Sequence, residues 1–216
     1  MKDRLEVDRS KQVAMMVLTA LMTGILCVTG PISIPIGPVP ISIGVLVLFL
    51  TVYVLGTKYA TIACVLYLIL GLAGLPVFAG HQGGLSKLAG PTGGYLIGYI
   101  PMVIIAGVII DITKKNRDNH INESSGAADA VATGRSAGIK KGLIKSLIQG
   151  AGMLLAVVVL YTFGTAWFVI STGTPVGAAL SLCVIPFIPA DLIKIVIAAI
   201  LGPTLAGITK RINSQA

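Results

Sequence analysis

Between Lys11 and Lys58 the chain reads QVAMMVLTALMTGILCVTGPISIPIGPVPISIGVLVLFLTVYVLGT, a stretch without a single Lys, Arg, Asp or Glu. Three further uncharged stretches follow, at residues 59–86, 88–110 and 146–190. A helix needs about 20 mostly apolar residues to cross a bilayer. Of the 216 residues, 55% are hydrophobic and only 11% are charged, which is more apolar surface than a water-soluble domain of this length can bury. We therefore expect an integral membrane protein with several helices.

Proline and glycine divide the uncharged stretches into separate spans. The segment 30–40 holds four prolines and cannot be helical, because proline lacks an amide hydrogen and restricts the residue before it. A short inner turn at Thr57 and Lys58 separates the next two spans. The expected class is an all-α membrane domain over residues 1–216 with six transmembrane helices, at 11–29, 41–56, 59–75, 92–110, 143–163 and 190–208.

The basic residues indicate the orientation of these spans. The formal net charge is +8, and nearly all Lys and Arg lie in the tail 1–10, the segment 112–142 or the tail 209–216. The positive-inside rule places all three in the cytoplasm, together with both termini. Segment 112–142 is expected to be a mobile linker between four-span and two-span parts, residues 11–111 and 143–208. Because the charges flank the spans, we expect no nucleic-acid partner.

The segment 74–99 is unusually rich in glycine, and reads GLPVFAGHQGGLSKLAGPTGGYLIGY. With few side chains to bury, such a segment has to fold tightly over something or against its neighbours. By the span count, residues 76–91 form an outer loop, which we interpret as a lid over a small-molecule pocket. The candidate lid residues are Phe78, Gly80, Gly83, Gly84, Gly93 and Gly94. The polar groups of the loop are His81, Gln82, Ser86 and Lys87, of which Gln82 and Ser86 are candidate ligand contacts.

Asp191 and Lys194 are the only charged residues of the sixth span before its inner end. A charge inside a membrane helix costs about 2.5 kcal/mol or more at the helix centre, so we expect the pair to have a structural or functional role. Their spacing places them on one helix face, where Lys194 can offer a cation to an anionic ligand group while Asp191 orients it and accepts hydrogen bonds. In the alternative interpretation, Asp191 caps the N-terminus of the helix and Lys194 only neutralises the charge of Asp191.

Aromatic residues with polar tips supply further candidates. Tyr95 follows the Gly93-Gly94 pair, and Tyr99 shares its helix face one turn on. Both are candidate ligand contacts, although a tyrosine near the interface is more often an anchor. Trp167 fits the interfacial belt, with stacking on a ligand as the alternative.

Several classes of site are absent from the sequence. It contains no phosphate loop, nucleophile elbow or HExxH motif, so no catalytic residues are expected. Cys27, Cys64 and Cys183 lie in different apolar stretches and are expected to be small buried residues, not metal ligands or bridges.

An ion-coupled secondary transporter would need ionisable groups at the membrane midplane and often repeated halves, and neither is seen. Uphill transport would then draw its energy from another polypeptide.

The first span carries the small residues Ala14, Ala20 and Gly24. Small residues let membrane helices approach closely. They serve either packing within the chain or docking of a partner membrane subunit.

Three motifs, GLPVFAG (74–80), GPTGGYLIGY (90–99) and PFIPADLIK (186–194), resemble the BioY family of biotin-binding S components of energy-coupling factor (ECF) vitamin transporters. The resemblance spans essentially the whole chain. It implies six helices in a bacterial or archaeal plasma membrane and a biotin site near the outer face. It also implies a transmembrane coupling protein and two cytoplasmic ATPases as partners, which consume the ATP, with biotin as transported ligand and no cofactor.

The resemblance also assigns individual residues. The family's binding tyrosine after Gly-Gly matches Tyr95, and its Asp and Lys match Asp191 and Lys194. Some members carry a basic residue where this chain has Tyr99. Many carry Thr and Gln where this chain has Ser42 and Gly44.

Overall fold

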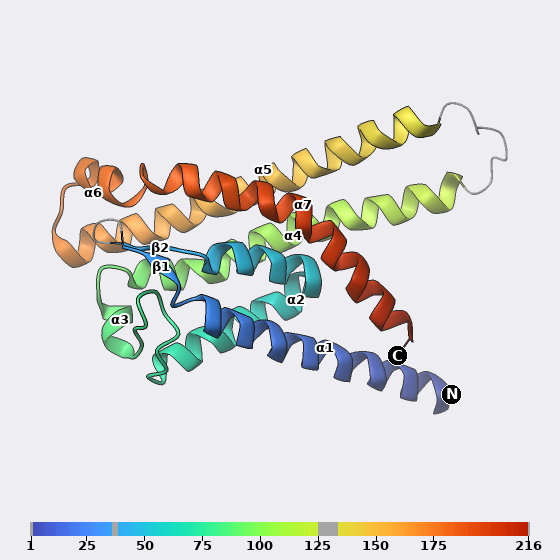
Figure 1. Cartoon of the computed structure of the whole chain (residues 1–216), viewed down its shortest axis with the longest axis horizontal. Coiled ribbons are helices and arrows are strands. Elements are labelled where there is room, and N and C mark those ends of the chain that lie inside the picture. The colour runs from blue at the N-terminus through green and yellow to red at the C-terminus, as the bar shows by residue number, and fades with distance from the viewer. Residues whose placement is uncertain (1, 36–38, 125–133, 216) are drawn as a thin grey trace.

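The structure, a computed structural model, describes residues 2–35, 39–124 and 134–215, with side chains for 9–35, 39–114, 145–207 and 209. Its regular structure is almost entirely helical. Figure 1 shows the elements in order, which are α1 (Lys2–Thr29), β1 (Ser33–Ile34), β2 (Ile41–Ser42), α2 (Gly44–Leu72), α3 (Leu85–Ala89), α4 (Gly93–Ser124), α5 (Gly134–Thr172), α6 (Val176–Cys183) and α7 (Phe187–Gln215).

In the described part of the chain, five helices are long and apolar enough to cross a membrane: α1, α2, α4, α5 and α7. Large aliphatic side chains on their outer faces stay exposed, such as Val17 at 62% and Ile170 at 80%. An exposed apolar surface of this extent suits contact with lipid and not with water. The expectation of a multi-pass membrane protein is confirmed.

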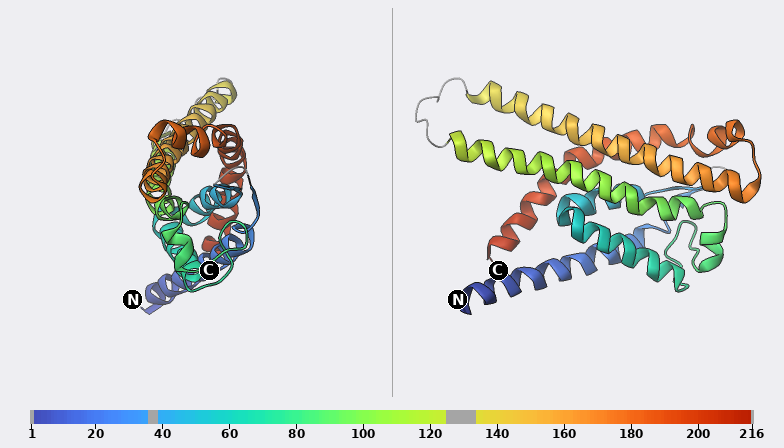
Figure 2. Two further views of the ribbon diagram at one scale, coloured as in Figure 1. Left: turned by 90° about the vertical axis from the view of Figure 1, so that its left-hand side faces the viewer. Right: turned by 180° about the vertical axis from the view of Figure 1, so that it is seen from behind.

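Helix α2 lies at the centre of the bundle, where it packs against α1, α4 and α7, while α4 packs along α5. Its residues Phe49, Val52 and Tyr53 are almost completely buried. The chain termini lie at the same end of the bundle, and α3, α6 and the small sheet lie at the other (Figures 1 and 2). In that sheet β1 and β2 are antiparallel, with Ser33 opposite Ser42, so the proline-rich segment closes as a short ribbon.

Helix α2 consists of two arms that fold back at Gly56, where φ is 72° and ψ is 176°. Glycine suits this position because a positive φ is costly for other residues. One turn of α4 caps both arms. The carboxylate of Asp111 accepts hydrogen bonds from Thr57 N (2.9 Å) and Oγ1 (2.6 Å), while Lys114 Nζ donates to Tyr53 O (3.0 Å). A break in a membrane helix is tolerated only where its freed backbone groups find such partners.

We expect Asp111→Ala to destabilise the protein by about 1–3 kcal/mol, because the variant leaves two donors of Thr57 without an acceptor. Asp111→Asn is the matched control, since it keeps one acceptor oxygen and should lose less. Thermal unfolding of both variants in detergent measures the difference. An unchanged unfolding temperature for Asp111→Ala would show that the capping contacts contribute nothing to stability.

Several predicted boundaries differ from the observed ones. The sequence predicted that the fifth span ends at residue 163, but α5 continues to Thr172 and ends at Gly173, whose φ of 68° suits a helix C-terminus. Gly164 lies inside this helix, and its bare backbone lets the ring of Tyr95 pack closely against it.

The segments predicted as tails and linker also contain helix. Helix α1 begins at Lys2, α7 continues to Gln215, and the linker 112–142 includes the end of α4 and the start of α5. Propagating an existing helix adds one hydrogen bond per residue, so long helices continue into polar sequence. The centre of the linker, 125–133, lies outside the described residues.

Candidate functional site

The candidate site residues gather at the end of the bundle that carries α3, α6 and the sheet. Two cavities share a wall there. The outer cleft is lined by Gln82, Gly83, Ser86, Lys87, Gly90, Pro91 and Thr92. The inner cavity, about 40 Å3, is lined by Gly30, Val39, Pro40, Ser42, Tyr67, Phe78, Ala79, Lys87, Thr92, Tyr95, Leu96 and Tyr99. Of the predicted contacts, Gln82 and Ser86 thus face the outer cleft, and the two tyrosines face the inner cavity.

The loop 76–91 is anchored by aromatic residues. Phe78 is completely buried, and its ring meets that of Tyr67 edge to face, with ring centroids 5.6 Å apart. The hydroxyl of Tyr67 donates to Val77 O at 3.0 Å. Phe78 and Gln82 exchange two backbone hydrogen bonds of 2.9 and 3.3 Å, which closes a tight turn. The predicted lid is therefore a folded loop held by a buried phenylalanine.

The lid glycines serve close backbone contacts. Gly80 N donates to Pro31 O at 3.1 Å, and Gly84 N donates to Gly71 O at 2.7 Å. A Cβ on Gly83 would lie 2.2 Å from Leu75 O, so no larger residue fits there. These contacts tie the loop to the ends of α1 and α2.

Gly93 and Gly94 belong to the first turn of α4 and not to the loop. A Cβ on Gly94 would lie 2.2 Å from the Cβ of Trp167, so this glycine lets α4 approach α5. Trp167 Nε1 donates to Gly90 O at 3.0 Å. The indole thus joins α5 to the end of the loop.

Tyr95 is buried and held by two contacts. Its ring packs on the backbone of Gly164, its hydroxyl donates to Cys183 O at 3.0 Å, and only 8% of its surface is exposed. Tyr99 lies one turn further along the same cavity wall, with its hydroxyl near Gly44. Both tyrosines therefore line the inner cavity as rigid aromatic walls.

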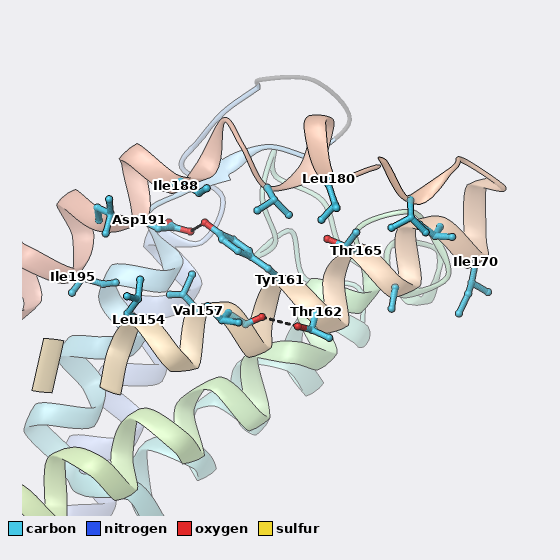
Figure 3. A pocket seen from close by; sticks show the side chains of 16 residues that line it. Leu154, Val157, Tyr161, Thr162, Thr165, Ile170, Leu180, Ile188, Asp191 and Ile195 are labelled. Carbon is cyan, nitrogen blue, oxygen red and sulfur yellow. Dashed lines mark hydrogen bonds between the residues drawn. The ribbon is translucent and has the colours of Figure 1, made fainter. Parts of the chain in front are cut away.

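Asp191 and Lys194 form an ion pair with a distance of 2.7 Å between Oδ1 and Nζ. The second carboxylate oxygen of Asp191 accepts a 2.6 Å hydrogen bond from the hydroxyl of Tyr161. Figure 3 shows Tyr161 reaching from α5 to Asp191 on α7. Asp191 is 5% exposed, and in the described interactions its partners are side chains, not the backbone of the first turn. This contact pattern disfavours the alternative in which Asp191 is only a helix cap.

Sequence reasoning missed Tyr161 as part of this network. One signal was available, since Tyr161 is the only tyrosine after Tyr99 and lies in an apolar run. A buried tyrosine hydroxyl usually finds a hydrogen-bond partner, and the only acid in the second half of the membrane domain is Asp191. Sequence reasoning also left out Thr92 and did not select Lys87 as a ligand contact.

A larger hollow of about 760 Å3 lies between α5, α6 and α7 (Figure 3). Apart from Tyr161, Thr162, Thr165 and Asp191, its lining is aliphatic. Such a lining offers few partners for a polar ligand. We therefore place the candidate site in the two smaller cavities, where polar and aromatic groups converge. The fold does not bring Asp191 and Lys194 into their lining: Asp191 and Tyr161 line the larger hollow, and Lys194 lines none of the three.

Metal-binding groups and disulfides do not contribute to this site. Among the described residues, no cluster of three or more His, Cys, Asp or Glu side chains could hold a metal ion. The three cysteines are unpaired, with Cys64 and Cys183 buried and Cys27 half-buried.

Comparison with known proteins gives consistent matches. The sequence profile of the BioY family matches residues 1–211. The biotin transporter BioY of Thermotoga maritima is 34% identical over 187 residues, which cover 87% of this chain and 92% of that protein. The probable biotin transporter BioY of Pyrococcus horikoshii is 32% identical over 192 residues, covering 89% and 96%.

A solved structure supports the same relationship. The crystal structure of the S-component for biotin from an ECF-type ABC transporter matches with a TM-score of 0.69 and 26% identity, over 91% of this chain and 92% of that one. The similarity thus extends over nearly the full length in both sequence and fold. This chain belongs to the BioY family.

Proposed function

We propose that this protein is the substrate-binding S component of an ECF-type transporter, that it captures biotin at the outer face of the membrane, and that it is not an enzyme. The relatives named as biotin transporters and the matching biotin S-component support this function. The observation that carries it is the convergence of aromatic and polar groups on the cavity beneath the loop 76–91.

The chemistry of biotin matches the lining of this cavity, which at about 40 Å3 would have to open to admit the ligand. Its bicyclic ring system has an apolar thioether part, which suits the walls formed by Tyr67, Tyr95 and Tyr99. Its ureido group is neutral and needs both donors and acceptors. The network of Asp191, Lys194 and Tyr161 could supply them, although Asp191 and Tyr161 line the hollow between α5, α6 and α7 and not this cavity. Its carboxylate needs a cation. Closure of the loop over the ligand would exclude water and strengthen these hydrogen bonds.

We propose six membrane crossings with both termini in the cytoplasm. At about 1.5 Å per residue, the two arms of α2 span roughly 18 and 24 Å, less than the ~30 Å of a bilayer core. The turn at Gly56 would therefore lie within the inner membrane boundary, which explains why Asp111 and Lys114 cap it. The common position of the termini and the basic residues of both tails support the cytoplasmic side.

Partner subunits would drive the transport step. We propose a transmembrane coupling protein and two ATPases, with the coupling protein docking on the outer face of α1. Ala20 and Gly24 are exposed there, with Ala14 half-buried, and no atom lies within 4 Å of a Cβ built on Gly24. Such a shallow face allows another helix to approach closely. ATP hydrolysis on the partners would then rock the loaded bundle toward the cytoplasm.

The direct test of the proposed function is biotin binding by the purified protein in detergent, measured by isothermal titration calorimetry. A saturable interaction with about one biotin per chain is expected. Absence of binding under conditions in which the protein remains folded would refute the proposal.

The docking face has its own test. We expect Ala20→Trp to leave biotin binding unchanged and to reduce biotin uptake into cells at least tenfold, because a bulky ring keeps the coupling protein at a distance. Val196→Trp is the matched control, since Val196 is an exposed residue of α7 outside the proposed face. Radiolabelled biotin uptake measures both variants. Equal uptake by the two variants would contradict docking on α1.

A further inference from the structure

Lys87 occupies the wall between the outer cleft and the inner cavity. It belongs to the short helix α3 of the loop and is the only charged residue between Lys58 and Asp111. Its side chain is partly buried, and this burial lowers the pKa of the ammonium group. The loop thus carries a cation to the place where the two cavities meet.

Among the residues whose side chains the structure describes, Lys87 forms no ion pair with a carboxylate. Of the eight acidic residues of the chain, seven lie at positions 3–8 or 111–129, away from the loop in sequence. The eighth is Asp191, whose two oxygens already accept from Lys194 and Tyr161. Among the described side chains at this end of the bundle, Lys87 and Lys194 thus share one acid, Asp191, which is paired with Lys194. A partly desolvated cation without a counter-charge is a ready partner for an anion.

Thr92 is a second polar residue in the lining that the two cavities share. Its hydroxyl oxygen is buried without a hydrogen-bond partner. Buried polar atoms are nearly always hydrogen-bonded, so an exception points to a missing group. A hydroxyl and an ammonium group that line the same two cavities can each bind one oxygen of a carboxylate.

We propose that Lys87, with Thr92, binds the carboxylate of biotin and makes the loop the element that selects for this charge. The proposal rests on the function proposed above. It assigns the carboxylate end of biotin to the loop and leaves Asp191 and Lys194 for the neutral ureido group. A carboxylate beside Lys194 would instead place two anions around one cation. The loop closes most favourably over a ligand that brings its own negative charge.

The test compares biotin with biotin methyl ester, which is the same molecule without the charge. The wild-type protein is expected to bind biotin about 10- to 100-fold more tightly than the ester, the range for hydrogen bonds to a charged group. Lys87→Met should lose this preference by weakening biotin binding while ester binding changes little. Lys87→Arg should keep it. Lys58→Met is the matched control, since this lysine lies near the turn of α2 and should not affect the preference.

The variants and the ester distinguish three cases. If Lys87→Met keeps the wild-type preference, the proposal is wrong. If the preference disappears in Lys194→Met instead, the carboxylate binds at Lys194 and the assignment of the two ends is reversed. If the wild-type protein binds neither ligand, the proposed function fails and not merely this inference.

The pH dependence gives an independent readout. Because burial lowers the pKa of Lys87, its ammonium group loses its proton at lower pH than an ordinary lysine. Biotin affinity should then fall as the pH rises through this pKa and stay higher in Lys87→Arg. The polar side chains that line these cavities together with Lys87 are Gln82, Ser86, Ser42, Thr92, Tyr67, Tyr95 and Tyr99, and the titratable groups among them are the three tyrosines. A parallel fall in Lys87→Arg would assign the effect to the tyrosines and contradict the role of Lys87.

Discussion

Asp191→Ala is expected to abolish measurable biotin binding and to lower the stability of the folded protein. The substitution removes the acceptor of both Lys194 and Tyr161 and leaves the ammonium group of Lys194 buried without a partner. Breaking a buried ion pair on one side typically costs about 3–5 kcal/mol. Thermal unfolding and calorimetric biotin titration in detergent measure the two effects separately.

The double variant Asp191→Asn with Lys194→Met distinguishes a binding role from a structural one. It removes both charges, so no lone charge remains buried, and stability should return close to that of the wild type. Biotin binding should not return, because the ureido group has lost its partners. A double variant that binds biotin with wild-type affinity would show that the pair is only structural. Tyr161→Phe should weaken binding about tenfold, since it removes one hydrogen bond to a charged group.

Gly164→Ala is expected to weaken both folding and binding although it adds a single methyl group. The new Cβ would lie 2.3 Å from ring atoms of Tyr95, so the ring has to move. Its hydrogen bond to Cys183 O and its place in the cavity wall are then disturbed. Overpacking of this kind typically costs about 1–3 kcal/mol. We expect a lower unfolding temperature and at least tenfold weaker biotin binding.

Gly150→Ala is the matched control for this prediction. Gly150 lies in the same helix, and no atom lies within 4 Å of a Cβ built on it. Alanine favours a helix over glycine by up to about 1 kcal/mol, so this variant should be as stable as the wild type or slightly more stable. If both alanine variants behave alike, the contact between Gly164 and Tyr95 does not position the site.

The membrane class could be predicted from the sequence, and the candidate site residues were selected from it. Long uncharged stretches favour membrane helices whatever their neighbours, because hydropathy acts on each segment separately. The free-energy cost of a charge in the membrane identified Asp191 and Lys194, and glycine density identified the loop 76–91. The family resemblance is confirmed by the profile match to residues 1–211.

Only the tertiary structure decided which groups meet. Tyr161 and Asp191 lie 30 positions apart on different helices, and Asp111 caps a turn 54 positions away. The sequence did not indicate that Lys87 and Thr92 act together, and the fold places both in the lining of the same two cavities. Such partnerships depend on how helices pack and on where a folded loop lies, and no local sequence pattern encodes them. Hydropathy therefore determined that the chain lies in a membrane, while contacts between distant segments determined what its polar residues can bind.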